Sequence, residues 1–397
     1  MKVSVRKGDS LWYYSQLFAM PLQLLVDSNH MIEPKFLQIS QHIHIPGFLI
    51  RTHRIKEGDT LWKIAQSHNL SLDALLLLNQ NLTSENLLIA ETIQVPVRVT
   101  ELIVFGEKEY DYQAMMGDIN QLLEIYPFIR YKSIGKSVLG SPIPELRIGR
   151  GKKKVHVNGS FHANEWITTP IIMKFLNEYL LSLTNMTPIR GFYTQPLYYE
   201  ALLSIVPMVN PDGVDLVLNG PPQQEPYKSE VVQINNQSTD FSNWKANIRG
   251  VDLNNQYPAN WEIEKERKEP KSPAPRDFPG DSPLTEPEAI AIAELTKKRN
   301  FSRVLAFHTQ GEEIYWGYEG YEPKEAQTIV EEFAKVSGYK AVRYVDSHAG
   351  YKDWFILEWK RPGYTIELGK GVNPLPIEQF AEIYEESLGI FLASLYM

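Results

Sequence analysis

The chain of 397 residues contains no cysteine. Disulfide bonds, thiolate metal sites and a cysteine nucleophile are therefore excluded, and a bound metal would need His, Asp or Glu as ligands. Long apolar runs are also absent: no segment approaches the roughly 18 apolar residues of a membrane-spanning helix, and the N-terminus has no apolar stretch of signal-peptide length. We expect a protein that does not insert into a membrane and is not exported by the ordinary signal route.

An excess of positive charge is lacking as well. Lys and Arg number 40 against 48 Asp and Glu, which gives a net charge of -8. Binding to a phosphate backbone needs a concentrated positive field, so nucleic acid is not expected as a partner. The length and the hydrophobic fraction of 43% predict a packed protein of several domains.

An internal repeat occupies the N-terminal part of the chain. The segment Lys7–Trp12 recurs as Glu57–Trp62, at an offset of 50 positions. The same offset relates Asn29 to Asn79, Ile45 to Val95 and Pro46 to Pro96. In each copy a short strand, a Gly-Asp turn that caps a helix, a second helical segment and a final strand before proline predict a βααβ unit. The expected strands are Lys2–Arg6 and His42–Ile45, then His53–Lys56 and Thr92–Val95.

The repeated pattern resembles the LysM module, and the resemblance covers about residues 1–97 as two copies, 1–47 and 51–97. It implies binding to glycans that contain N-acetylglucosamine. A dimerisation or spacer module is the alternative interpretation. Because Trp12 and Trp62 lie at the start of the first helix of each copy, we expect them to be core residues and not platforms for sugar rings.

From residue 98 onward the pattern is mixed α/β. Short apolar runs predict buried strands, and amphipathic segments predict helices between them. The expected strands are Lys154–Val157, Leu203–Val209, Val304–His308 and Tyr364–Leu368, and the expected helices include Thr169–Leu183 and Glu286–Lys298. Residues 98–397 are therefore predicted to form one domain with a mixed, mostly parallel sheet and helices on both faces. The proline-rich segment Glu266–Pro287 is predicted to be a long surface loop that borders a cleft.

Candidate metal ligands follow two of the predicted strands. His162 and Glu165 are spaced three apart on a turn, so both can face one ion, and His308 ends an apolar strand. Two histidines and one glutamate leave a coordination position open, which is typical of a catalytic zinc site. Glu367 places a carboxylate inside another apolar strand, where a functional role is expected. The segment Trp244–Asn255 adds a cation, a carboxylate and amides.

Together these residues resemble the zinc carboxypeptidases of the carboxypeptidase A type, over about Tyr110–Tyr396. The motifs that carry the resemblance are His162-x-x-Glu165, Asn210-Pro211-Asp212-Gly213, Arg249-Gly-Val-Asp-Leu-Asn254, His308 and Thr-Ile-Glu367. The resemblance implies one Zn²⁺ per chain, bound by His162, Glu165 and His308. It implies Glu367 as general base and then acid, Arg249 as stabiliser of the oxyanion, and Asp252 as acceptor for the free ring nitrogen of His162. It also implies a tyrosine over the substrate, for which Tyr344 is the candidate and Tyr351 the alternative.

The sequence departs from this family where a substrate's terminal carboxylate would be bound. Asn255 and Asn164 stand where many members have arginine, and a neutral amide cannot replace a charge-assisted clamp. We expect both, with Asn254, to bind substrate, but release of a C-terminal amino acid from ordinary peptides is not expected. The remaining candidates for substrate carboxylates are Arg343, Arg276 and His348, which spacing alone does not separate from surface charge.

The whole chain resembles the γ-D-glutamyl-L-diamino acid endopeptidases of spore-forming bacteria, which join LysM modules to this catalytic domain. The segments that support this are Trp244–Asn247, His308–Gly311 and Ala349–Trp354. The resemblance implies hydrolysis between γ-D-glutamate and diaminopimelate in peptidoglycan stem peptides, in a sporulating cell or at its wall or spore. A metallocarboxypeptidase and a catalytically silent wall-binding protein are the alternatives. The oligomeric state is not decided by the sequence.

Overall fold

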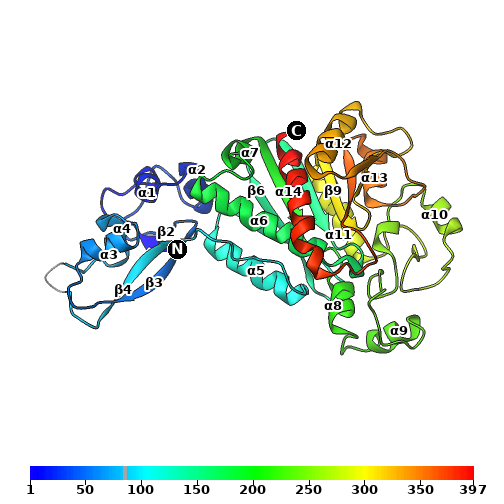
Figure 1. Cartoon of the computed structure of the whole chain (residues 1–397), viewed down its shortest axis with the longest axis horizontal. Helices are drawn as coiled ribbons and strands as arrows, with labels where there is room; N and C mark the ends of the chain where they lie inside the picture. The colour runs from blue at the N-terminus through cyan, green and yellow to red at the C-terminus, as the bar shows by residue number, and fades with distance from the viewer. Residues whose placement is uncertain (84–86) are drawn as a thin grey trace. The chain divides into compact units, whose positions relative to one another are not determined.

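The computed structural model describes residues 1–83 and 87–397, and it forms two compact units (Figure 1). The first unit comprises Met1–Ile103, Asp118–Arg130 and Asn177–Gln195, and the second comprises Val104–Gly117, Tyr131–Leu176 and Pro196–Met397. The second predicted repeat, 51–97, includes residues 84–86, which lie outside the described residues.

The first unit contains the βααβ arrangement twice. Its elements are β1 (Lys2–Ser4), α1 (Leu11–Leu17), α2 (Leu22–Ser28) and β2 (His42–His44), then β3 (Phe48–Arg54), α3 (Leu61–Ser67), α4 (Leu72–Leu78) and β4 (Thr92–Arg98). The strands pair antiparallel, β1 with β2 and β3 with β4. The second copy begins its strand at Phe48 instead of the expected His53 and ends it at Arg98, because this hairpin continues beyond the repeat itself.

An asparagine at the same position of each repeat, Asn29 and Asn79, makes the same pair of hydrogen bonds. The Nδ2 of Asn29 donates to His44 O and its Oδ1 accepts from His44 N, both at 2.8 Å. Asn79 makes the same pair of bonds with Gln94, at 2.6 and 3.0 Å. In each copy one amide therefore ties the end of the second helix to the final strand.

The expectation that Trp12 and Trp62 are core residues is wrong. Their exposed fractions are 64% and 62%, whereas the preceding Leu11 and Leu61 are 2% and 6% exposed. Successive side chains of a helix point about 100° apart, so the leucine occupies the core and turns the tryptophan outward. Both copies therefore present a tryptophan to solvent at the same position.

The second unit is built on a mixed eight-stranded sheet in the order β11-β10-β12-β9-β7-β8-β6-β5. Its strands are β5 (Arg130–Lys136), β6 (Pro142–Gly149), β7 (Lys153–Gly159), β8 (Ala201–Val206), β9 (Arg303–Thr309), β10 (Glu313–Tyr315), β11 (Lys340–Val342) and β12 (Gly363–Leu368). The central strands β12, β9, β7 and β8 run parallel to one another, and β10 and β6 join them antiparallel. The predicted fold class is confirmed.

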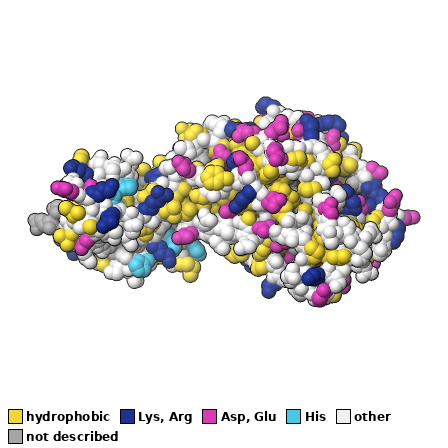
Figure 2. Space-filling model, turned by 60° about the horizontal axis from the view of Figure 1, so that its bottom comes forward, with side chains coloured by type: hydrophobic (Ala, Val, Ile, Leu, Met, Phe, Trp, Pro, Cys, Tyr) yellow, Lys and Arg dark blue, Asp and Glu magenta, His cyan; other side chains and the backbone are white. Residues whose placement is uncertain are grey.

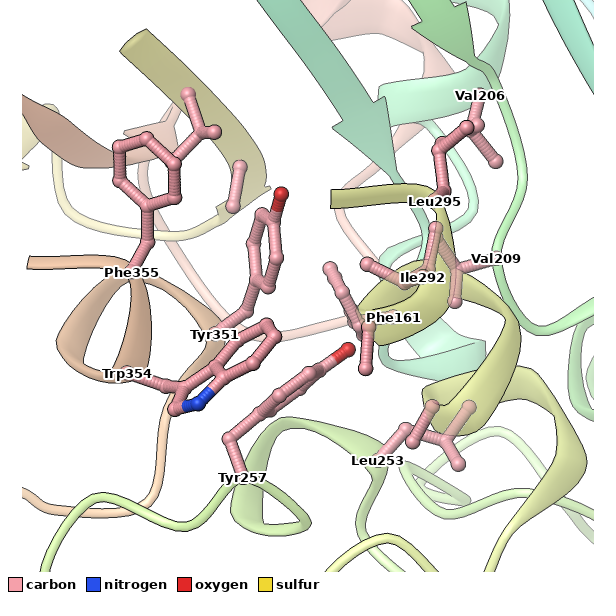
Figure 3. Close-up of a cluster of buried hydrophobic side chains, with 14 of the residues drawn as sticks. Phe161, Val206, Val209, Leu253, Tyr257, Ile292, Leu295, Tyr351, Trp354 and Phe355 are labelled. Carbon is pink, nitrogen blue, oxygen red and sulfur yellow. The ribbon is translucent and has the colours of Figure 1, made fainter. Parts of the chain in front are cut away.

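Helices cover both faces of this sheet. The helices that follow the repeats in the chain are α5 (Tyr112–Ile125), α6 (Thr168–Asn185), α7 (Thr194–Glu200), α8 (Pro211–Asn219), α9 (Tyr227–Ile234), α10 (Trp261–Arg267), α11 (Pro287–Arg299), α12 (Lys324–Ser337), α13 (Tyr351–Trp359) and α14 (Phe380–Tyr396), with single 3-10 turns at Ala163–Glu165, Leu253–Asn255 and Ile377–Gln379. On one face Phe307 of β9 stacks on Phe391 of α14, with ring centroids 4.6 Å apart. On the other face α11 and α13 build a core in which Phe161, Tyr257, Tyr351 and Trp354 pack together (Figure 3).

The proline-rich segment between α10 and α11 has no helix or strand, as expected, but it is not wholly a surface loop. Phe278 is 4% exposed, and its carbonyl accepts a hydrogen bond from Asp252 N at 2.7 Å. The carbonyl of Pro275 accepts from the backbone of Lys245 and Ala246. The middle of the segment is therefore packed against residues 245–252.

The distribution of charge on the surface and the character of the helices match what the composition predicts. Figure 2 shows side chains of both charge signs interspersed over the face in view, without a continuous basic area. Within the described residues, no helix combines the length and the apolar character that crossing a lipid bilayer requires.

Candidate metal centre

The site forms where three neighbouring parallel strands end. His308 of β9 and Glu367 of β12 are register partners, and β7, on the other side of β9, ends at Gly159 shortly before His162. Because the carboxyl ends of parallel strands meet at one edge of the sheet, residues distant in sequence are brought together there.

The turn after β7 is held by its own hydroxyl groups. Ser160 N and Ser160 Oγ bond to Thr168 Oγ1, at 2.8 and 3.0 Å, and Thr168 Oγ1 donates to Glu165 O. A Cβ atom at Gly159 would lie 2.9 Å from Thr168 Oγ1 and 3.2 Å from Pro207 O, so only glycine allows this close approach. The turn thus places His162 and Glu165 on the same side.

Three buried side chains meet at this turn. The Nδ1 atoms of His162 and His308 lie 3.1 Å apart. Glu165 lies between them, with Oε1 2.8 Å from the first ring and Oε2 2.9 Å from the second. All three residues are at most 6% exposed. The structure therefore brings together the three residues that the sequence predicts as metal ligands.

These donors fit a zinc ion. In a tetrahedral site with bonds of about 2.0–2.1 Å, neighbouring ligand atoms lie roughly 3.3 Å apart, close to the separations found here. Burial alone would raise the pKa of Glu165, but the two imidazoles outweigh it and lower that pKa to about 2. Burial would lower the pKa of His162, but Glu165 and Asp252 raise it to about 9. The cluster therefore favours a positive charge between its members, which a divalent cation supplies.

A second layer of contacts orients the ligands. Asp252 Oδ1 lies 3.2 Å from Nε2 of His162, as the resemblance implied, and Asp252 Oδ2 lies 2.8 Å from Nζ of Lys245. Asn373, which the sequence analysis missed, donates to Thr309 O and lies 3.4 Å from Glu165 Oε1. An asparagine in a loop carries no sequence signal that would have identified it.

Glu367 lies partly exposed beside the three ligands. Burial and the nearby Glu165 carboxylate raise the pKa of Glu367 to about 8, and the charges of His162 and Lys245 oppose this rise. A carboxylate with a pKa near neutrality can both accept and return a proton. A cation among the ligands would favour its ionised form.

Arg249 faces a different part of the molecule. Its side chain is 45% exposed and lies 3.6 Å from Glu286. It lines a hollow of about 700 Å³ together with residues of α9, among them Tyr227 and Gln233. Lys245 is the cation that influences the pKa values of the ligands and of Glu367. The oxyanion role of Arg249 therefore stays a prediction, and its contacts in the structure do not support it.

The two candidate tyrosines have different surroundings. Tyr351 is buried in the core, where its hydroxyl lies 2.9 Å from Thr296 Oγ1. Tyr344 is 52% exposed, donates to Glu322 Oε1 at 2.9 Å and lines a pocket of about 370 Å³ with Tyr318. Of the two, Tyr344 is the one that solvent reaches.

The three candidate amides are mostly engaged within the fold. Asn254 Oδ1 accepts from Tyr351 N at 3.0 Å, and Asn255 Nδ2 lies 3.4 Å from Glu264 Oε1. Asn164 is 3% exposed within the ligand turn. Their binding to substrate stays a prediction.

The three candidate carboxylate-binding groups also have protein partners. Arg343 pairs with Glu322, Arg276 with Asp277, and His348 Nδ1 lies 3.0 Å from Tyr318 OH. Their binding to substrate carboxylates likewise stays a prediction.

Comparison with known families finds two matches. The zinc carboxypeptidase family matches residues 115–389, and the LysM domain matches residues 3–46 and 53–96.

Two relatives cover much of the chain. The sequence is 61% identical over 397 residues to gamma-D-glutamyl-L-diamino acid endopeptidase 1 of Lysinibacillus sphaericus, covering 100% of both chains. It is 51% identical over 304 residues to YqgT, an uncharacterised protein of Bacillus subtilis, covering 76% of this chain and 81% of that protein.

Solved structures share the fold at low sequence identity. Carboxypeptidase A of Helicoverpa armigera superposes with a TM-score of 0.56 at 19% identity, covering 73% of each chain. Bovine thrombin-activatable fibrinolysis inhibitor, in complex with tick carboxypeptidase inhibitor, gives 0.55 at 18% identity, covering 73% of this chain and 97% of that one.

Proposed function

Because the chain belongs to the zinc carboxypeptidase family and carries two LysM domains, we propose that it is a zinc-dependent γ-D-glutamyl-L-diamino acid endopeptidase that acts on peptidoglycan stem peptides. The observation that carries the proposal is the convergence of His162, Glu165 and His308 on one point beside Glu367. The domain limits 1–47, 51–97 and 98–397 belong to the same proposal.

One Zn²⁺ per chain would be held by His162, Glu165 and His308. When bound, zinc polarises the scissile carbonyl and lowers the pKa of water from 15.7 to about 7. Asp252 Oδ1 lies 3.2 Å from Nε2 of His162, where its carboxylate can hold the orientation of the ring. The three ligands are buried, and a zinc ion with three protein ligands would keep a fourth position for water or substrate.

Glu367 is the proposed general base and then acid. Its carboxylate is partly exposed at the end of β12, next to the ligands, and can take a proton from the attacking water and return it to the leaving amine. Tyr344 is the proposed residue over the substrate, since its side chain is accessible.

Asparagine in place of arginine at positions 164 and 255 supports an endopeptidase rather than a carboxypeptidase. Asn255 approaches the buried Glu264 carboxylate and Asn164 is buried, so neither offers a cation to a terminal carboxylate. The LysM domains support a wall substrate, with glycans that contain N-acetylglucosamine as the bound polymer. Activity inside a sporulating cell, or at its wall or spore, is the setting that we propose.

A comparison of two substrates tests the proposal. The full chain, loaded with zinc, is incubated with L-Ala-γ-D-Glu-diaminopimelate and, separately, with a hippuryl dipeptide, and the products are weighed by mass spectrometry. We expect cleavage of the first at the γ-D-glutamyl bond, and its loss after zinc is removed by a chelator. Preference for the dipeptide would favour a metallocarboxypeptidase. A chain without zinc and without either activity would favour a silent wall-binding protein.

A further inference from the structure

A row of charged side chains crosses the sheet beside the metal centre, and the proposed mechanism uses only part of it. Glu367 of β12 is the register partner of His308 on one side and of Glu313 on the other. Glu313 of β10 is in turn the register partner of Lys340 of β11. Register partners on neighbouring strands point to the same face, and the strands are about 4.8 Å apart. Glu313 and Lys340 therefore continue the line that runs from the metal ligand through Glu367.

The face that carries this row is the open one at these strands. Ile314, the residue of β10 that follows Glu313, is fully buried. Side chains alternate between the two faces of a strand, so Glu313 and Tyr315 point away from Ile314, to the side of Glu367. The side chains of Glu313 and Lys340 are 27% and 75% exposed. A ligand at the metal centre can therefore reach both charges.

Glu313 is held in place but keeps room for a ligand. Tyr315 OH donates to Glu313 Oε2 at 2.8 Å, and Lys340 Nζ lies 3.1 Å from Glu313 Oε1. The bond from Tyr315, followed by the contact with Lys340, lowers the pKa of Glu313, so its carboxylate is ionised. A carboxylate can accept about four hydrogen bonds and an ammonium group can donate three. Because an exposed ion pair contributes little to stability, the fold itself does not account for this pair.

The proposed reaction places a diamino acid next to the row. When the γ-D-glutamyl bond is cleaved, the diamino acid is the leaving amine, and Glu367 returns a proton to its nitrogen. The diamino acid therefore lies beside Glu367. Diaminopimelate carries a second ammonium group and a second carboxylate at the far end of a long, unbranched side chain. Glu313 and Lys340 lie about one and two strand widths from Glu367, which is the reach of such a side chain.

We propose that Glu313 and Lys340 select the diamino acid of the substrate: Glu313 binds its distal ammonium group, and Lys340 binds its distal carboxylate. Tyr315 keeps the Glu313 carboxylate in position. The inference rests on the proposed function, because it needs a substrate with a diamino acid on the leaving side of the bond. The alternative role for Lys340 is to protect the edge strand β11 from pairing with other chains, for which a lysine is sufficient.

The experiment compares three peptides, L-Ala-γ-D-Glu-X, in which X is diaminopimelate, lysine or α-aminopimelate. Lysine lacks the distal carboxylate, and α-aminopimelate lacks the distal ammonium group. The kcat/KM of the full chain, loaded with zinc, is measured for each peptide, and each variant is judged by the ratios between peptides. Effects that reach the reaction through Glu367 cancel in these ratios, because they act on all three peptides alike.

Glu313→Gln keeps the size of the side chain and removes its charge. We expect kcat/KM for the diaminopimelate and lysine peptides to fall roughly 10- to 100-fold relative to the α-aminopimelate peptide, the scale of a hydrogen bond between charged groups. An equal fall for all three peptides, or no fall, would overturn the assignment of Glu313.

Lys340→Met should produce the complementary change. We expect kcat/KM for the diaminopimelate and α-aminopimelate peptides to fall roughly 3- to 10-fold relative to the lysine peptide, a smaller effect because the Lys340 side chain is largely in solvent. At this exposed position the variant also gives a test if Glu313→Gln does not fold. Unchanged ratios would leave Lys340 with a role at the sheet edge alone and overturn its assignment.

Glu294→Gln is the matched control. Glu294 forms an exposed ion pair with Lys297 of α11, at 3.1 Å, and does not belong to the row. All ratios between peptides should stay at their wild-type values, and a shift as large as that of Glu313→Gln would overturn the inference by showing a general effect of surface charge. Wild-type protein that cleaves none of the three peptides at the γ-D-glutamyl bond would instead refute the proposed function.

Discussion

At the scale of single residues, Glu367 illustrates how neighbours set a chemical role. It lies at the end of an apolar strand, opposite His308, and its pKa is raised to about 8 by burial and by Glu165. A cation bound between His162, Glu165 and His308 would offset that repulsion, so the ionised base would form when the metal is in place.

Replacing Glu367 by glutamine should separate metal binding from proton transfer. Glu367→Gln keeps the three ligands and the shape of the side chain, so zinc binding should be retained. Turnover should fall by at least about 2 to 4 powers of ten, the scale of general acid-base catalysis. Metal analysis and single-substrate kinetics check both parts, and near-normal turnover would contradict the assigned role.

His156 on β7 predicts a dependence of stability on pH. Its ring is fully buried against Phe301, with centroids 4.6 Å apart, and burial lowers its pKa from 6.5 to about 3. Below pH 6.5 the unfolded chain binds a proton that the folded chain does not. The contribution of His156 to stability is thus present above pH 6.5 and is lost as the pH falls, by up to about 1.4 kcal/mol per pH unit.

His156→Phe tests this dependence. Phenylalanine can keep the stacking but has no proton to bind, so the free energy of unfolding should fall less steeply between pH 7 and pH 4.5 than in the wild type. Urea unfolding at several pH values measures both slopes. Equal slopes would show that the buried ring does not contribute to acid sensitivity.

At the scale of elements, the N-cap residue of α8, Asn210, makes hydrogen bonds to three separate segments near the site. Asn210 is fully buried, and its Oδ1 accepts from Gly213 N at 3.1 Å. Its Nδ2 donates to Phe161 O at 3.2 Å and to Ala246 O at 3.0 Å. One side chain therefore connects the start of α8, the ligand turn and the segment that carries Lys245.

Asn210→Ala should destabilise the second unit by about 2 to 4 kcal/mol, since it removes a helix cap and leaves two buried carbonyls without a donor. Chemical denaturation with and without zinc measures the loss. Asn210→Asp is the matched control: it retains the acceptor for Gly213 N but still lacks the two donated bonds. A wild-type free energy of unfolding in Asn210→Ala would contradict this account of α8.

At the scale of the whole molecule, the two repeats expose the same aromatic side chain. Trp12 and Trp62 are exposed to nearly equal extents at equivalent positions, and both lie in the LysM domains. An exposed tryptophan can cover the apolar face of a sugar ring, so these side chains are candidates for contact with the wall glycan.

The double variant Trp12→Ala/Trp62→Ala should bind insoluble peptidoglycan at least about tenfold more weakly, because burial of a large apolar side chain contributes about 1.5–3 kcal/mol and about 1.4 kcal/mol is a factor of ten. Cleavage of a small soluble stem peptide should be unchanged. Phe105→Ala, at a residue that is 66% exposed outside the repeats, is the control for general loss of apolar surface. Unaltered pelleting with the wall polymer would exclude these tryptophans from glycan binding.

Local patterns explain why much of the site was predictable. His162 and Glu165 are three residues apart on one turn, and His308 and Glu367 interrupt apolar strands, so each signal lies within a few residues. The surroundings of Arg249 could not be predicted in this way. Asn247 N bonds to Val251 O at 2.8 Å, and Gly250 has a φ of +74°. This tight turn leaves Arg249 in solvent, a consequence of backbone geometry that the sequence pattern does not reveal.

The sequence by itself determined the repeat, the fold class, the metal-ligand types and the absence of a thiolate alternative, because these follow from residue spacing, hydrophobic period and composition. Only the tertiary structure decided which cation faces Asp252, that Asn373 and Asn210 support the ligands, and that Trp12 and Trp62 face outward. Those outcomes depend on how distant segments pack against one another, and a contact between them exists only after strands, turns and loops have assembled.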